Sequence, residues 1–233
     1  MRHAFVYMLV VVCTPLVSLV AQERGYSFIG FGAFTTSSKL FPDPNNSDEF
    51  IRARFLGIDD IFSGGIELRR DIASLRTQIS LSVEYLQKSE TVIVPVSSVQ
   101  VPVKDGFRAI PIEITGRFLI PFSEEHLQIT IGGGIGVYLG NRIYEFPGAA
   151  APTVERTMGF GIHITSGIEY FLNSTFSLCS DIKFRDVQFE TVNQFSQPLI
   201  VYSGTVVQLP QEPMTSRMNI DGMTVTIGLA FHF

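Results

Sequence analysis

Among the histidines of this chain, His163 has neighbours that proton transfer would need. It stands in the middle of "MGFGIHITSGIEY" (158–170), with Glu169 in the same segment and Asp181 in the next one. A histidine beside a carboxylate can relay a proton or activate a nucleophile. A histidine that is simply hydrogen-bonded inside the protein has the same neighbours, and we favour that interpretation.

Two other motifs suggest ligand chemistry on first inspection. "GGGIG" (132–136) is similar to a dinucleotide-binding loop, but that loop must open a helix, and here an apolar/polar alternation continues through Val137 and Leu139. "DPNNSDE" (43–49) has many oxygen ligands but lacks the spacing of a calcium loop. We therefore predict no catalytic, metal or cofactor site, and expect the glycines to make room inside the fold or to let a strand bend.

The elements that must position these residues are β-strands. Apolar and polar side chains alternate along eight segments, which is the period of a strand with two unlike faces. The predicted strands cover about 26–34, 62–70, 75–86, 107–120, 127–140, 158–170, 176–186 and 223–233. Several have the about 9–11 residues that cross a bilayer when tilted. Pro111 removes a backbone donor from the fourth strand, which predicts a bulge or a different strand boundary there.

Short and long connections alternate between these strands. The short ones lie near 71–74, 121–126 and 172–175, and the long ones span roughly 35–61, 89–106, 143–155 and 190–217. An up-and-down barrel in an outer membrane has tight periplasmic turns and longer external loops in this order. The valine-rich runs 92–103 and 197–210 could form hairpins above the membrane, either packed together or binding a partner. We favour mutual packing.

The polar faces of the strands favour a narrow barrel interior over a surface in contact with water. Glycine, serine and threonine dominate them, and the charges are of both signs, so that they can pair inside a crowded lumen. A soluble barrel would turn its apolar face inward and expose more lysine. The predicted interior charge network comprises Glu67, Arg69, Arg76, Glu84, Glu113, Arg117, His163, Glu169, Asp181, Lys183 and Arg185.

Composition and the N-terminal segment agree with an exported membrane protein. Residues 1–21 combine Arg2, a short apolar run and small residues near Ala21, which predicts a cleaved signal peptide and leaves 22–233 as the barrel domain. Its removal leaves 16 of the 17 basic residues against 22 acidic ones, which argues against a nucleic-acid partner. The charged fraction of 17% lies below the roughly 25% of soluble domains.

The eight alternating strands and the terminal "GLAFHF" resemble small bacterial outer-membrane β-barrels of the OmpA, OmpX and OmpW type. The resemblance implies an all-β, up-and-down antiparallel transmembrane barrel of eight strands in the cell outer membrane. In that family, a last strand that ends in Phe, with aromatics at alternate positions, is the signal read by the barrel-assembly machinery. The resemblance therefore assigns an assembly signal to Phe231 and Phe233, and implies outer-membrane lipid and that machinery as partners.

For function, we expect a structural or surface-interaction role, with external loops displayed on a barrel whose interior is filled by side chains. A surface ligand bound through those loops is the expected further partner. One alternative is a small pore or a conduit for small or apolar solutes, although eight strands leave little room for a channel. A loop-top enzyme, such as a lipid acyltransferase, deacylase or protease, is disfavoured because His126, His163 and His232 all lie outside the predicted long loops.

Overall fold

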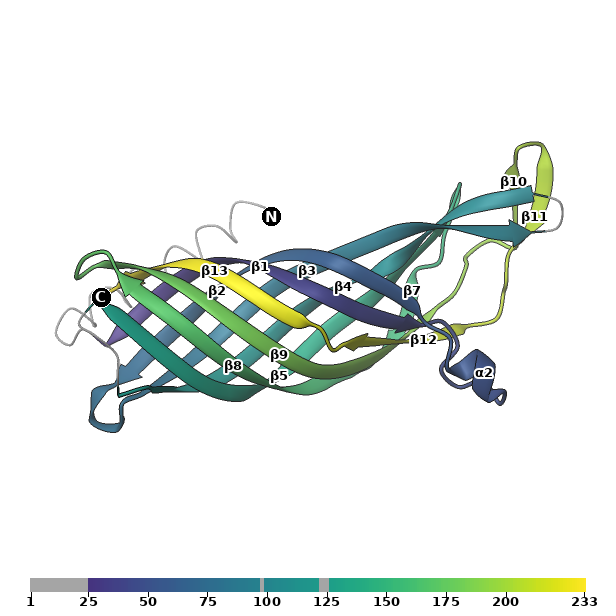
Figure 1. Ribbon diagram of the computed structural model, residues 1–233. Coiled ribbons are helices and arrows are strands. Elements are labelled where there is room, and N and C mark those ends of the chain that lie inside the picture. The colour runs from purple at the N-terminus through teal and green to yellow at the C-terminus, as the bar shows by residue number, and fades with distance from the viewer. Residues whose placement is uncertain (1–24, 97–98, 122–125) are drawn as a thin grey trace, which may run out of the picture.

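The structure is a computed structural model that describes residues 25–96, 99–121 and 126–233, and strands make up nearly all of it (Figure 1). The predicted signal peptide (1–21) and most of the predicted turn at 121–126 lie outside the described residues. No helix in the described parts is long and apolar enough to span a bilayer.

Within the described residues the strands close into an antiparallel ring of eight positions. The first seven positions are β1 (Tyr26–Phe41), β2 (Leu56–Ile72), β3 (Thr77–Val96), β4 (Val99–Leu119), β5 (Leu127–Phe146), β8 (Met158–Phe171) and β9 (Phe176–Asn193). Two collinear strands, β12 (Met214–Ile220) and β13 (Met223–His232), share the eighth. Because β1 pairs with both β2 and β13, the sheet closes on itself into a ring. The predicted up-and-down barrel is confirmed.

The two faces of each strand have opposite surroundings. On β9, the side chains of Leu178, Ile182 and Phe184 point outward and are exposed, whereas Lys183 and Arg185 point into the barrel and are buried. The same alternation of exposed apolar and buried polar residues runs along β3, β4 and β8. A closed barrel with this pattern satisfies its backbone internally and presents an apolar belt, which is the arrangement that a bilayer requires.

A local irregularity divides the eighth strand position. The pairing of β1 shifts by one residue between Thr35↔Thr224 and Lys39↔Asn219, so Asp221–Gly222 forms a bulge. A Cβ on Gly222 would lie 2.4 Å from the Ser37 carbonyl oxygen, so a larger residue does not fit there. Buried positions still alternate across the bulge, but the inward residues Met218 and Ile220 are apolar, so β12 lacks the contrast between faces that marked the other strands. Its first residues therefore fell into the predicted loop 190–217.

Pro111 lies inside β4 without a bulge and without ending the strand. The register of β3 on β4 is the same before and after it, from Val83↔Ile112 to Leu86↔Ala109. On its other side Pro111 pairs with Tyr138 of β5. The strand accommodates the missing donor by a local gap in the β3–β4 ladder, so the predicted bulge or changed boundary is wrong.

The short connections between strands lie at one end of the barrel, called here the turn end (Figure 1). The chain enters its first strand and leaves its last strand at this same end. It carries the turn η1 (Ala73–Leu75) and the link at 172–175. Tyr26 and Phe233 exchange backbone hydrogen bonds there, at 3.3 and 2.9 Å. The start of the first strand and the end of the last strand therefore lie on the same side of the barrel, as an even number of strands requires.

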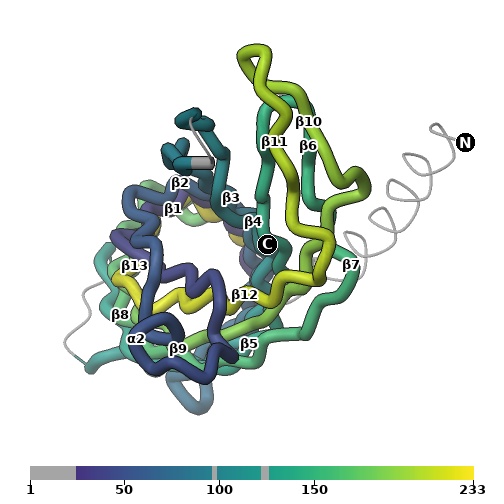
Figure 2. The backbone as a smooth tube through the Cα atoms, turned by 90° about the vertical axis from the view of Figure 1, so that its right-hand side faces the viewer, coloured from purple at the N-terminus to yellow at the C-terminus, as the bar shows by residue number. Residues whose placement is uncertain are grey.

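The opposite end, the loop end, is longer and more structured than the sequence predicted. The prediction of a loop at 89–106 is wrong, because β3 and β4 stay paired out to Val96↔Val99. The prediction of a hairpin at 92–103 is confirmed. The loop end also carries α2 (Glu49–Arg52), β6 (Ala149–Ala150) and β7 (Thr153–Arg156). A second hairpin, β10 (Leu199–Tyr202) with β11 (Thr205–Gln208), rises to one side of the ring (Figure 2).

Candidate functional site

The interior nearest the turn end holds a group of charged side chains centred on Glu67. Arg69 reaches Glu67 at 3.1 Å and Glu169 at 2.7 Å, and Arg117 donates to Glu67 at 2.9 Å. All four side chains are buried. Strands β2, β4 and β8 supply them, so the ion pairs connect distant parts of the barrel wall.

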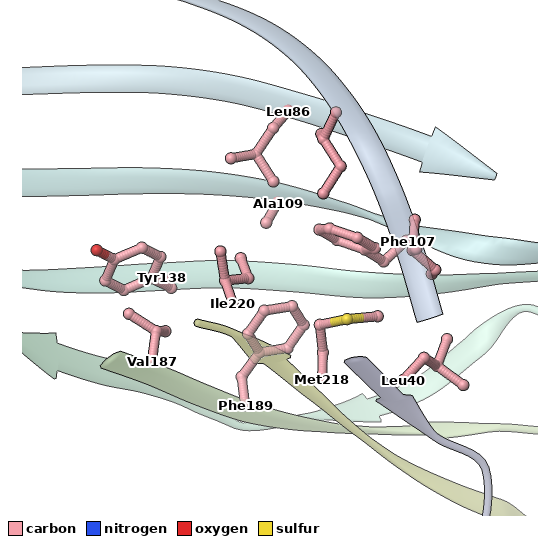
Figure 3. Packing of buried hydrophobic residues seen from close by; sticks show 11 residues of the cluster. Leu40, Leu86, Phe107, Ala109, Tyr138, Val187, Phe189, Met218 and Ile220 are labelled. Carbon is pink, nitrogen blue, oxygen red and sulfur yellow. The ribbon is translucent and has the colours of Figure 1, made fainter. Parts of the chain in front are cut away.

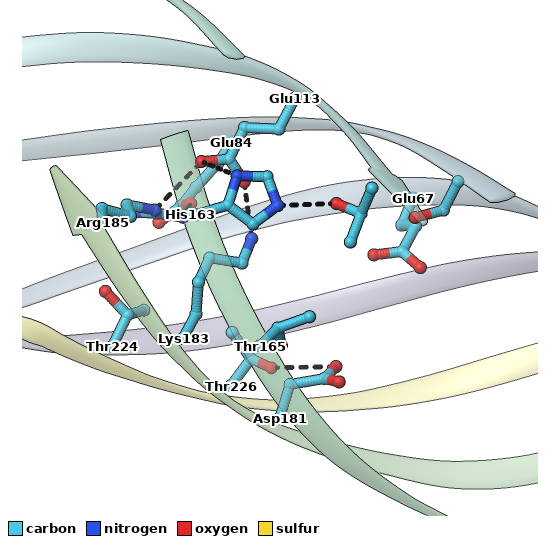
Figure 4. A network of polar contacts seen from close by, with 12 residues as sticks. Glu67, Glu84, Glu113, His163, Thr165, Asp181, Lys183, Arg185, Thr224 and Thr226 are labelled. Carbon is cyan, nitrogen blue, oxygen red and sulfur yellow. Dashed lines mark hydrogen bonds and ion pairs between the residues drawn. The ribbon is translucent and has the colours of Figure 1, made fainter. Parts of the chain in front are cut away.

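A second group of charges is centred on Glu113, which precedes Arg117 on β4 and so lies nearer the loop end. Figure 4 shows the contacts of this group. Lys183 donates to Glu113 at 2.5 Å, and the Arg185 Nε atom lies 3.1 Å from the same carboxylate. Arg185 also pairs with Glu84, and the Tyr138 hydroxyl donates to Glu113. The Arg185 side chain is 0% exposed, so this group has been removed from water and depends on its partners.

Ten of the eleven predicted network residues lie in these two groups or at their border. Asp181 lies at the border, 3.7 Å from Arg117 and within reach of Thr226. Arg76 does not belong to the network, and its prediction as an interior charge is wrong. It follows η1 with a φ of 49°, and its side chain is exposed. The turn takes Arg76 out of the strand alternation on which that prediction rested.

His163 is buried among groups other than the two predicted for it. Its Nε2 atom lies 2.9 Å from the Thr115 hydroxyl and its Nδ1 atom 3.9 Å from Glu113, whereas Glu169 and Asp181 belong to other contacts. Gly134 makes room for the ring, since a Cβ there would lie 2.8 Å from it. The histidine therefore has the contacts of a packed interior residue, which supports the expected role of the glycines.

His232 joins strands at the turn end in a way that the sequence did not reveal. Its Nδ1 atom lies 3.0 Å from the Ser27 hydroxyl of β1, and its Nε2 atom lies 2.8 Å from the Ser177 hydroxyl of β9. Glu169 lies 3.3 Å from Nε2. The inward position of His232 on β13 was predictable from the alternation, but its partners on three other strands were not.

An apolar layer lies in the interior between the Glu113 group and the loop end. Figure 3 shows how its side chains pack together. Its members are all less than 5% exposed: Leu40, Ile58, Ile61, Leu86, Phe107, Ala109, Tyr138, Val187, Phe189, Met218 and Ile220. Gly140 faces Phe189, and a Cβ at Gly140 would lie 2.1 Å from that ring. The sequence prediction expected a polar interior throughout, and this layer corrects it.

Polar and apolar contacts extend the packing beyond this layer into the loop end. Arg142 donates to Asp105 at 2.6 and 2.8 Å and to the Ser216 hydroxyl at 2.6 Å. Tyr144 stacks against the Arg142 guanidinium at 4.2 Å, and burial raises the pKa of the Tyr144 hydroxyl.

A second apolar cluster lies still farther out and joins the two hairpins of the loop end. It contains Val101, Val103, Phe146, Ala149, Ala151, Phe195, Ile200, Val207 and Leu209. The cluster shows that the two valine-rich runs, 92–103 and 197–210, pack together.

The described residues contain no group of three or more His, Cys, Asp or Glu side chains placed to hold a metal ion. The buried ionisable groups of the interior pair with one another instead. The interior is filled by alternating layers of ion-paired and apolar side chains.

Comparison with solved structures identifies the architecture. The outer membrane protein OprG from Pseudomonas aeruginosa superposes with a TM-score of 0.58 at 14% identity, over 91% of this chain and 97% of OprG. The chain has the fold of the small eight-stranded barrels of the bacterial outer membrane. This fold and the apolar belt agree on a location in the outer membrane. The short turns of such barrels face the periplasm, so we expect the turn end to lie on that side.

Two further similar structures have lower TM-scores. Neisserial surface protein A gives 0.47 at 11% identity, over 90% of this chain and 97% of that one. Ail, the attachment invasion locus protein of Yersinia pestis, gives 0.47 at 12% identity, over 91% and 100% of the two chains. No protein-family model and no curated protein matches the chain.

Proposed function

We propose that this barrel is a closed scaffold that holds a rigid external head for binding at the cell surface. The external head is defined here as residues 90–96 and 99–107 of the β3–β4 hairpin, 142–152, and 194–214. The observation that carries the proposal is the apolar cluster in which these segments pack together. Val103 on one hairpin and Val207 on the other are both buried in it.

The interior supports a scaffold rather than a wide channel. Layers of ion pairs and of packed apolar side chains cross the barrel, and their central members, such as Arg185 and Phe107, are fully buried. Eight strands enclose a space that side chains can fill. The proposed role is non-enzymatic, because His163 and its carboxylate neighbour lie within this packing.

The head supports an interaction role because it displays apolar groups that its own packing does not use. Val201 is 72% exposed and Val206 60% exposed, on a two-stranded hairpin whose outer edges have no partner strand among the described residues. Ile93 and Leu199 are also exposed. Unpaired strand edges with apolar side chains are surfaces to which another protein can add.

The proposal can be tested with purified barrel in lipid nanodiscs on an array of immobilised matrix proteins, serum proteins and glycans. The wild type should bind at least one class of target, and V201D/V206D should reduce that binding by tenfold or more. The control N45D/S47D adds the same charge at exposed polar positions of the loop before α2, outside the head, and should bind normally. A wild type that binds nothing above empty nanodiscs, or an unaffected V201D/V206D variant, would overturn the proposal.

A conduit for small apolar solutes is the second candidate, and one observation favours it. The interior toward the loop end is lined by hydrocarbon side chains such as Ile61, Phe107 and Met218 instead of charges. This candidate requires those side chains to move apart, and it requires a path past the charged groups around Glu113 and Glu67. Permeability of barrel-containing vesicles to apolar solutes distinguishes it from the scaffold.

A further inference from the structure

A cavity of about 670 Å³ opens in the outer wall of the barrel beside β7, where the strand pairing changes. On the side of the cavity nearer the turn end, β8 pairs with β5 up to Leu139↔Met158. Nearer the loop end the segment before β8 no longer pairs with β5, and β7, which forms part of it, pairs only with β9. Asn141 and Ile143 of β5 therefore face Val154 and its neighbours across a gap, and all of these residues line the cavity.

The rim of this cavity is cationic. Lys104 and Arg108 of β4 and Arg156 of β7 line it. Lys104 has a carboxylate partner, Glu145, at 3.7 Å. The guanidinium groups of Arg108 and Arg156 make no ion pair and no hydrogen bond within the described parts of the chain. Two unpaired arginines at one cavity are suited to an anionic group, and arginine binds phosphate in a bidentate manner.

The position of these cations relative to the apolar belt indicates the kind of anion. Arg108 stands one outward position beyond Ile110 on β4. Arg156 lies two residues before Met158, but the register on β9 shifts between them, from Phe160↔Gln188 to Arg156↔Thr191, so Arg156 leaves the outward row of β8 and lines the cavity from β7. Ile110 and Met158 are exposed on the outer face, and Leu139 is half-buried between them in the register. Two residues along a strand rise by about 6.6 Å, so Arg108 lies where the headgroups of a bilayer would begin, and Arg156 lines the same cavity.

We infer that this cavity binds the phosphate-bearing headgroup of an outer-leaflet lipid. The phosphate would lie between Arg108 and Arg156, and the acyl chains would run along Ile110, Leu139 and Met158. Asn141, which pairs directly with Arg108 in the ladder, offers a neutral hydrogen-bonding group beside the phosphate. Glu155 also lines the cavity and opposes an anion, so binding should strengthen when it is neutralised.

Native mass spectrometry of the barrel with diphosphoryl lipid A as the probe tests this inference. The wild type should retain the lipid, and R108Q/R156Q should bind it about 25-fold more weakly, at about fivefold for each cation near a membrane surface. R52Q/R54Q removes two exposed cations from the α2 loop on the same side of the membrane and should bind as the wild type does. E155Q should bind more tightly than the wild type.

Three results would overturn the inference. These are equal binding by R108Q/R156Q and R52Q/R54Q, equal binding of lipid A with and without its phosphates, and retention of inorganic phosphate alone as strongly as of the lipid. The last result would identify a site for free phosphate instead. If the double variant does not fold, R108Q and R156Q are measured singly, and each should show about a fivefold loss. The inference requires a barrel in a membrane but not the proposed binding by the external head, so the two can fail separately.

Discussion

Replacing Arg185 with glutamine is expected to destabilise the barrel by about 3–5 kcal/mol, the usual effect of breaking a buried ion pair from one side. Arg185 is fully buried and contacts two carboxylates, Glu84 and Glu113. Its removal leaves Glu84 with only the Ser63 hydroxyl, at 2.6 Å, and leaves Glu113 with Lys183 as its nearest cation. The large magnitude comes from these uncompensated carboxylates, which are then buried in a region with little water.

Urea unfolding in lipid vesicles, followed by far-UV circular dichroism because the chain contains no tryptophan, measures the effect. R217Q is the control, since Arg217 pairs with Glu190 at 2.9 Å while both side chains remain 35% exposed. Such an exposed pair should contribute less than about 1 kcal/mol. The double variant R185Q/E84Q should be less destabilised than the sum of its single variants by about 1–3 kcal/mol. If R185Q unfolds like R217Q, the interior charges are hydrated and the closed scaffold is refuted.

Three further predictions concern packing, closure and assembly. G140A should lower the free energy of unfolding by about 1–3 kcal/mol, because its methyl group would overlap the Phe189 ring. In the control G32A the added methyl group meets nothing within 4 Å, so this variant should be as stable as the wild type. Equal urea midpoints for the two variants would contradict this packing. H232A should lower the unfolding free energy by about 1–3 kcal/mol through its lost serine and carboxylate contacts, and a loss below about 0.5 kcal/mol would contradict that role. Appending two lysines after Phe233 should slow insertion in cells but not refolding into vesicles, and unchanged insertion would remove the assembly signal.

The strand content and the orientation of side chains could be predicted from the sequence, because alternation with a period of two survives in a single strand. It assigned Lys183 and Arg185 to the interior, where they lie. The same alternation continues through Val187 and Phe189, also inward. The prediction ended that strand at 186, because apolar residues at inward positions hide the contrast between the faces. The apolar layer was missed for this reason.

The partners of individual residues could not be predicted, because they depend on strands that are distant in sequence. Gly140 on β5 matches the ring of Phe189 on β9, and the pairing of His163 with Thr115 depends on the width of the closed ring. Arg76 was misplaced because a left-handed turn conformation leaves no mark on the periodicity. The sequence therefore indicates which face a residue takes, and the closed barrel determines what it meets there.

Single-channel recording in planar bilayers tests the closed scaffold most directly. The barrel is inserted in a defined orientation, and insertion is checked by the resistance of its strands to added protease. Layers of ion pairs around Glu113 and of packed side chains around Phe107 should block ions, so we predict a silent membrane at applied potentials of either sign. Reproducible conductance steps from the wild-type barrel would contradict the account, because they require a continuous aqueous path through both layers.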